Sequence, residues 1–215
     1  MSRALSICGV ILAAGESRRM GTDKALLPWP PSIPNQISAG TFLSAAIQAF
    51  APVSDVVIVV AGRNRASIAP IVYASGASLV INHEPDRGQF SSLQTGLQEV
   101  LNRGRDAAIV TLVDRPPVSP ATIDKLHAAF GSAIASWKWA LIPEYAGKHG
   151  HPIFLAREMI EAFLKAPPTG NARDVLHEKH EHIAYFEVDD LLVTVNVNTP
   201  DEYAALQRAA ILLRE

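Results

Sequence analysis

Residues 5–29 read LSICGVILAAGESRRMGTDKALLPW. This stretch joins an unbroken apolar run, 5–14, to a loop that carries two glycines, two arginines and a lysine between residues 15 and 24. An apolar run without alternation is typical of a strand that is buried on both faces of a parallel sheet. Ligands of such sheets bind beyond the carboxyl ends of the strands, so the basic loop predicts a site for a ligand with several negative charges.

Two glycines and three basic residues give this loop its chemistry. Gly15 and Gly21 can take backbone angles closed to other residues, which lets backbone N–H groups approach an anion closely. Arg18, Arg19 and Lys24 can neutralise phosphate oxygens. The spacing matches neither the G-x-x-x-x-G-K-[ST] phosphate loop nor the G-x-G-x-x-G dinucleotide turn. From these residues alone, an exposed turn with solvated charges is an equally good interpretation.

The length, composition and charge of the chain limit the classes of protein to which it can belong. The chain has 215 residues, 48% of them hydrophobic, and a formal net charge of −2. These values predict one α/β domain with a large core, exclude a disordered chain and argue against nucleic acid as a partner. The single cysteine, Cys8, lies in the first apolar run and is expected to be buried. Since no secretory signal or membrane-spanning run is recognised, we expect a cytoplasmic protein without a membrane partner.

Strand patterns alternate with helical patterns along the chain. Strands are predicted at 5–14, 55–61, 77–82 and 107–114, and helices at 41–50, 64–74, 91–104 and 119–130. Ser91 is interpreted as the cap of the third helix, and Ser119 with Pro120 as the start of the fourth. Residues 28–40 read as a long Pro-rich loop. The later, less regular part predicts strands at 139–145, 151–156, 182–188 and 193–197, and helices at 157–166, 171–180 and 200–215.

The order of these elements predicts the architecture. Repeated βα units indicate an α/β fold, a Rossmann-like three-layer α/β/α arrangement around a mainly parallel sheet. Three sets of marked residues directly follow strands: the loop 14–24, the stretch 82–92, and Asp114. Because the carboxyl ends of parallel strands meet at one edge, we expect these residues to form a single site.

The sequence resembles a known family at this point. LAAGESRRMGTDKALL (12–27) is similar to the pattern L-A-A-G-x-S-x-R-M-G-x-x-K-x-L-L of the MobA-like nucleotidyltransferases, which include the molybdenum cofactor guanylyl- and cytidylyltransferases and, more distantly, sugar-1-phosphate nucleotidyltransferases. The resemblance continues in NHEPDRGQFSSLQTGL (82–97), VDRPPVSPATI (113–123), GKHGHPIFL (147–155) and VNVNTPDEY (195–203). It implies one NTP-transferase domain over 1–215, of the nucleotide-diphospho-sugar transferase type. The nucleotide-binding half would span about 1–130 and the acceptor-binding half about 131–215.

The reaction implied by this resemblance moves a nucleoside monophosphate from an NTP to an acceptor phosphate and releases pyrophosphate. An acceptor phosphate is already an anion, so it needs alignment and charge neutralisation rather than a strong general base. The resemblance assigns catalytic contacts with the triphosphate to Arg18 and Lys24, and Mg²⁺ as the cofactor. It assigns nucleotide binding to the loop residues Leu12, Ala13, Ala14, Gly15 and Gly21.

Asp114 and Asn198 are the implied metal ligands, and Asp114 is the third catalytic residue. An amide oxygen is still a hard ligand, but it carries no charge and attracts a metal less strongly than a carboxylate. The alternatives are a structural acid at Asp114 and an Asx-type cap at Asn198. Val113 stands where the family has glycine, and Arg115 stands where it has an apolar residue. Arg115 could pair with Asp114 or reach a phosphate.

The remaining implied contacts concern the base and the acceptor. Asn82, Ser91 and Ser92 would recognise base and ribose, with ordinary helix capping by the serines as the alternative. His151 would shape the acceptor side without acting as a catalytic base, and Lys148 would contact the acceptor phosphate.

The expected function is therefore transfer from CTP, because the loop reads AAG rather than AGG, with GTP as the next choice. The acceptor is expected to be a small phosphorylated molecule, with a molybdopterin-type cofactor first and a sugar phosphate or another small phosphate as the alternative. Uncharged Asn196 and Asn198 motivate a second alternative, a nucleotide-binding module without catalysis that serves as a regulator or partner of a molybdoenzyme. A dinucleotide-dependent oxidoreductase is disfavoured because the G-x-G-x-x-G turn is missing.

Overall fold

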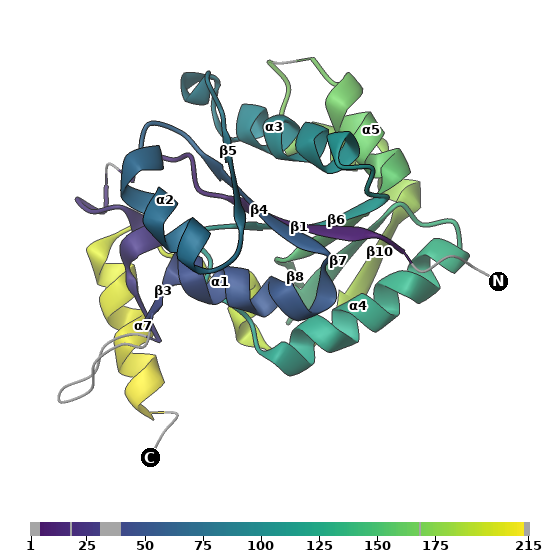
Figure 1. Ribbon diagram of the computed structural model, residues 1–215. Coiled ribbons are helices and arrows are strands. Elements are labelled where there is room, and N and C mark those ends of the chain that lie inside the picture. The colour runs from purple at the N-terminus through teal and green to yellow at the C-terminus, as the bar shows by residue number, and fades with distance from the viewer. Residues whose placement is uncertain (1–4, 18, 31–39, 168, 213–215) are drawn as a thin grey trace.

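The computed structural model describes residues 5–17, 19–30, 40–167 and 169–212, and in them an eight-stranded sheet forms the middle of the molecule (Figure 1). Its strand order is β10-β7-β9-β6-β1-β4-β5, with β8 paired to β7. Neighbouring strands run parallel except where β9 meets β6 and β7 and where β8 meets β7. The strands are β1 (Ile7–Leu12), β4 (Val56–Ala61), β5 (Ser78–Ile81), β6 (Ala107–Leu112), β7 (Ala140–Tyr145), β8 (Lys148–His149), β9 (Ile153–Ala156) and β10 (Ile183–Glu187).

Helices cover both faces of this sheet and give the three predicted layers (Figure 1). One face carries α1 (Phe42–Phe50), α2 (Arg65–Ala74) and α4 (Pro120–Ala135). The other carries α3 (Gln89–Asn102), α5 (Arg157–Lys165) and α6 (Ala172–Glu178). Short 3₁₀ turns are η1 (Lys24–Leu26), η2 (Ala51–Val53), η3 (Pro85–Arg87), η4 (His180–His182) and η5 (Leu191–Thr194). None of the described helices is long and apolar enough to cross a membrane.

Strand β1 lies at the centre because its sequence tolerates burial on both faces. All six of its residues are buried, and it pairs with β4 on one side and β6 on the other. The register aligns Leu12 with Val60 and with Leu112, so the three strands end at the same level. Cys8 is fully buried as predicted, and burial raises the pKa of its thiol to about 11.

The final helix returns to the beginning of the chain. α7 (Pro200–Leu212) lies beside the small ladder of β2 (Pro28–Trp29) and β3 (Gly40–Thr41), as Figure 1 shows. Tyr203 donates its hydroxyl hydrogen to the carbonyl of Pro28 at 3.0 Å. A small apolar cluster packs at this contact. Its buried residues are Met20, Leu27, Phe42 and Val197. The two ends of the predicted Pro-rich loop thus form a strand pair, and its residues 31–39 lie outside the described residues.

The start of α3 differs from the prediction. The helix begins at Gln89 with Gly88 as N-cap, so Ser91 lies in the first turn and does not cap it. Gly88 has φ 93° and ψ −178°, a region essentially reserved for glycine, which lets the chain enter the helix two residues earlier. The Ser91 hydroxyl lies 2.8 Å from the carbonyl of Gly88. The prediction for α4 is confirmed at its start, where Ser119 accepts from the Thr122 N–H and Pro120 follows.

The strand predicted at 193–197 is wrong. Residues 191–194 form the 3₁₀ turn η5, and 195–199 make no strand ladder. In V-T-V-N-V, Val193 and Val197 are fully inaccessible and pack against the core, whereas Val195 between them is half-buried. The segment's backbone bonds go elsewhere, because the Val193 carbonyl accepts from His151 and the Val197 N–H donates to the Asp114 carbonyl.

The space around two helical glycines, Gly96 in α3 and Gly131 in α4, shows how closely α3 packs on the sheet. A Cβ on Gly96 would lie 2.7 Å from Cγ1 of Val10 and 2.9 Å from Cγ2 of Val60, whereas a Cβ on exposed Gly131 in α4 meets open space. We predict that Gly96→Ala lowers the free energy of unfolding by about 1–3 kcal/mol because it overpacks the core. Gly131→Ala should raise it by about 0.5–1 kcal/mol. Urea denaturation measures both, and equal stabilisation by the two substitutions would contradict the seating of α3.

Candidate active site

Lys24 lies at the centre of the site. Its ammonium Nζ is 3.2 Å from Oδ2 of Asp114 and 2.8 Å from Oδ1 of Asn198. The side chains of Lys24 and Asp114 are only 12% and 23% exposed. Lys24 opens η1 after β1, Asp114 follows β6, and Asn198 precedes α7. The structure thus brings together three predicted residues from distant parts of the sequence.

The loop between β1 and η1 is held in a folded-back shape. Asn64 donates to the carbonyl of Ala13 at 2.9 Å and to the carboxylate of Asp23 at 2.8 Å. Ser17 accepts from the Lys24 N–H at 3.1 Å. Ser17 and Gly21 both have left-handed φ angles, 51° and 72°, so the predicted flexibility at Gly21 is used for a reversal of the chain. Arg18 lies outside the described residues.

A cavity of about 230 Å³ lies beside Lys24. Of the predicted residues it is lined by Leu12, Ala14, Gly15, Lys24, Ser92 and Asp114. Pro85, Gly88 and Gln89 also line it; they belong to the predicted stretch 82–92, but none of them was named individually as a site residue. Gly88, Gln89 and Ser92 place the first turn of α3, the positive end of its dipole, at this cavity, and no side-chain cap engages the N–H groups of that turn. The cavity therefore suits a ligand with anionic or hydrogen-bond-accepting groups.

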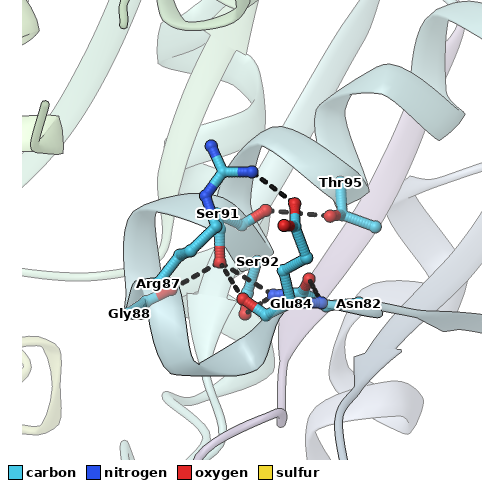
Figure 2. Close-up of polar contacts among 7 residues, drawn as sticks. All are labelled: Asn82, Glu84, Arg87, Gly88, Ser91, Ser92 and Thr95. Carbon is cyan, nitrogen blue, oxygen red and sulfur yellow. Dashed lines mark hydrogen bonds and ion pairs between the residues drawn. The ribbon is translucent and has the colours of Figure 1, made fainter. Parts of the chain in front are cut away.

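Asn82, Ser91 and Ser92 form a hydrogen-bonded cluster between the end of β5 and the start of α3 (Figure 2). Nδ2 of Asn82 donates to Oγ of Ser91 at 2.9 Å and to Oγ of Ser92 at 3.0 Å, and Oδ1 accepts from the Glu84 N–H at 2.9 Å. Ser92 lines the cavity beside Lys24, whereas Asn82 and Ser91 line a separate groove of about 720 Å³. Asn82 thus orients the serines, and of the three only Ser92 faces the cavity.

The predicted acceptor residues lie at the same edge of the sheet. Lys148 is exposed on β8, where it pairs with Tyr145, the last residue of β7. His151 precedes β9, whose first residue Ile153 pairs with Val110 near the end of β6. Burial, with a smaller effect of Arg115, lowers the pKa of His151 to about 3, so the ring is neutral at physiological pH. Neither residue bonds to Lys24, Asp114 or Asn198 in the part of the chain that the structure describes.

A capping box that the sequence analysis missed fixes the backbone of Asn198. Thr199 accepts from the Glu202 N–H at 3.3 Å, while the Glu202 carboxylate accepts from the N–H groups of Asn198 and Thr199. These bonds, that of Asn198 first, hold the pKa of Glu202 below its ordinary value. The pattern T-P-D-E at 199–202 is the signal that predicts this arrangement. The Asx-cap interpretation of Asn198 is therefore wrong, since its side chain bonds Lys24.

Arg115 does not pair with Asp114, the first of the two roles considered for it. Among the described residues it forms no ion pair with Asp114, whose carboxylate pairs with Lys24 instead. Its Nη1 lies 3.4 Å from the carbonyl of Val193. Burial lowers the pKa of Arg115, and the nearby charge of Asp114 opposes this effect.

Comparison with known proteins identifies the family. The MobA-like NTP transferase domain family matches residues 9–183. The chain therefore belongs to this family and is a nucleotidyltransferase of the MobA type.

Three relatives match nearly the whole chain. The purine catabolism protein PucB of Bacillus subtilis is 27% identical over 96% of this chain and 98% of its own. The molybdenum cofactor cytidylyltransferase of Escherichia coli is 25% identical over 90% of this chain and 92% of its own. The molybdenum cofactor guanylyltransferase of Xanthomonas euvesicatoria is 28% identical over 92% and 93%.

Solved structures confirm the predicted fold class. Rv0371c of Mycobacterium tuberculosis superimposes with a TM-score of 0.77 at 25% identity, covering 94% of this chain and 98% of that chain. A structure of Rv0371c in complex with manganese gives a TM-score of 0.72 at 24% identity, covering 95% and 99%.

The ion pair between Lys24 and Asp114 predicts that substitutions at these two residues have non-additive effects on the free energy of unfolding. We expect Lys24→Met and Asp114→Asn each to lower the free energy of unfolding in metal-free buffer. The double variant should lose about 1–2 kcal/mol less than the sum of the two, because each single change leaves a partly buried charge without its partner. The matched control is the exposed pair Lys165–Glu161, 3.8 Å apart, whose coupling should stay below about 0.5 kcal/mol. Additive losses at Lys24 and Asp114 would contradict the pairing.

Proposed function

We propose that this member of the MobA-like NTP transferase family moves CMP from CTP to an acceptor phosphate in a magnesium-dependent reaction that releases pyrophosphate. The observation that carries the proposal is the position of the Lys24 ammonium. It lies between the oxygens of Asp114 and Asn198, beside the cavity at the start of α3. A cation is thus already stabilised at the point where a nucleotide triphosphate would need one.

The donor set fits Mg²⁺. The carboxylate of Asp114 and the amide oxygen of Asn198 both lie within about 3 Å of one positive group, Nζ of Lys24. Mg²⁺ is typically held by one or two carboxylates together with substrate phosphates, so one charged and one neutral protein ligand is a workable set. A bound Mg²⁺ would supply charge neutralisation on the phosphate oxygens.

The chain's own residues would bind and align the two substrates. When Asp114 and Asn198 hold the metal, the Lys24 ammonium is free to donate to phosphate oxygens. Leu12, Ala14, Gly15, Ser92 and the first turn of α3 line the cavity and would contact the nucleotide, with Ala13 proposed as a further backbone contact. Arg18 is proposed as a further triphosphate contact.

The transfer step needs no strong base in this arrangement. An oxygen of the acceptor phosphate attacks the α-phosphorus, the new O–P bond forms as the α–β bridging bond breaks, and pyrophosphate leaves. His151 is neutral and cannot offset the acceptor's charge, whereas exposed Lys148 can. We therefore propose Lys148 as the acceptor-phosphate contact and His151 as a residue that shapes the acceptor side. Residues about 1–130 would bind nucleotide and about 131–215 the acceptor.

The nucleotide and the acceptor are inferred from the sequence of the loop and from the relatives. The AAG sequence of the loop supports CTP, and the cytidylyltransferase among the relatives supports a molybdopterin-type acceptor. The guanylyltransferase relative supports GTP as the next choice, and a sugar phosphate is the next acceptor class. A nucleotide-binding module without turnover is the second candidate function. It is favoured by the single charged ligand and by the engagement of both oxygens with Lys24.

Thermal unfolding with each of CTP, GTP, ATP and UTP, with and without Mg²⁺, tests this function. The expected result is a magnesium-dependent rise in Tm that is largest for CTP, since a ligand of the native state stabilises it by mass action. Pyrophosphate release with candidate acceptors then separates an enzyme from a binding module.

Asp114→Ala should reduce pyrophosphate release by about 10²–10³-fold while keeping a folded protein, because it removes charge stabilisation in the transition state. Asp124→Ala removes an exposed carboxylate from α4 and is the matched control. No Tm shift with any nucleotide, together with no pyrophosphate release, would overturn the proposed function.

A further inference from the structure

Arg115 and Asp114 clamp the segment that carries Asn198. The Asp114 carbonyl accepts from the Val197 N–H at 2.7 Å. Nη1 of Arg115 reaches the carbonyl of Val193, four residues earlier, at 3.4 Å. Two adjacent residues at the end of β6 thus hold residues 193–197 at two points. Asn198 directly follows Val197, so the distance of Asn198 from the Asp114 carboxylate depends on this clamp.

The acceptor-side segment contacts the same clamp from the other side. The His151 N–H donates to the Val193 carbonyl at 2.8 Å, so this carbonyl receives both His151 and Arg115. Gly150 lies so close that an added Cβ would be 2.2 Å from the Val193 oxygen. A movement at 150–151 must therefore move Val193, and with it the clamp.

Two buried nitrogen atoms mark the place where these segments meet. Nε of Arg115 and Nδ1 of His151 have no hydrogen-bond partner in the described protein, and both residues line one cavity of about 10 Å³. This is about the space of one water molecule. Nε–H of Arg115 is a donor, and Nδ1 of a neutral histidine donates or accepts according to its tautomer; a water can both accept and donate, so one water can satisfy both nitrogens. The chemistry of the cavity thus adds a second link between Arg115 and the acceptor-side segment.

We propose that Arg115 is a positioning residue that sets the spacing of Asp114 and Asn198 and couples it to the acceptor-side segment 148–152. The inference rests on the proposed function, because it gives Arg115 a role toward a divalent cation at that site. Arg115 does not touch the cation or the nucleotide; it acts through the Val193 carbonyl. Partners that orient metal ligands from behind typically change metal affinity by about 10- to 100-fold when they are removed.

Two readouts on the full chain test this role. The first is the affinity for Mn²⁺ in the presence of CTP, measured by electron paramagnetic resonance. The second is amide hydrogen exchange of the metal-free protein at Val197 and His151. We expect Arg115→Met to weaken Mn²⁺ binding by about tenfold and to speed exchange at both amides.

Arg115→Lys separates positioning from charge. Lysine keeps the positive charge beside Asp114 but lacks the fork that reaches Val193 while leaving Nε–H in the cavity. We expect it to remain impaired. Recovery of wild-type Mn²⁺ affinity and exchange rates in Arg115→Lys would overturn the positioning role.

Arg105→Met is the matched control. Arg105 also has a buried Nε without a partner, but it precedes β6 and bonds Ser6 and Asp55 at the opposite edge of the sheet. It should leave Mn²⁺ affinity within about twofold of wild type even where it lowers Tm. Wild-type Mn²⁺ affinity in Arg115→Met would overturn the inference alone. Failure of the wild-type protein to bind Mn²⁺ with any NTP would overturn the proposed function as well.

Discussion

The ammonium of Lys24 bonds Asp114 and Asn198, which lie 90 and 174 residues away from it in the sequence. Its contacts with Asp114 and Asn198 are more than ordinary surface ion pairing, because the Lys24 and Asp114 side chains are mostly buried. The two oxygens converge on one point beside a cavity, and a cation at that point offsets the charge of the partly buried carboxylate. The same requirement, a positive group between two hard oxygens, is what nucleotidyl transfer demands of a metal site.

The fold supplies this convergence through strand register and a returning helix. β1 and β6 end at the same level, so the loop that carries Lys24 and the residue Asp114 emerge side by side. Asn198 arrives from the other end of the chain and is fixed by the Glu202 carboxylate and by the bond of Val197 to Asp114. The hydrogen bonds at the N-terminus of α7 therefore also position Asn198.

Residues 5–14 and 55–61 could be predicted as strands because burial on both faces leaves a continuous apolar run. The start of the helix after β6 could be predicted from its capping signals, Ser119 and Pro120. The strand predicted at 193–197 failed because an alternation of valines with polar residues does not show where the backbone hydrogen bonds go, and here only Val193 and Val197 are buried. Ser91 failed as a cap because glycine at 88 opens the helix earlier, and a propensity for caps does not reveal a backbone angle.

The site was predictable in its members but not in its pairings. Lys24, Asp114 and Asn198 were named from the sequence, yet nothing in it decides whether Lys24 or Arg115 pairs with Asp114. That choice depends on side-chain direction at the end of β6. Asn82 precedes Ser91 and Ser92 by nine and ten residues, and nothing in the sequence shows that its amide bonds both serines and the Glu84 N–H.

The most direct test of the central claim is diffraction at the manganese absorption edge from crystals grown with Mn²⁺ and CTP. The predicted result is an anomalous peak within coordination distance of Oδ2 of Asp114 and Oδ1 of Asn198, with the Lys24 ammonium moved onto a phosphate. A peak elsewhere, with Lys24 still bonded to both oxygens while CTP is bound, would contradict it.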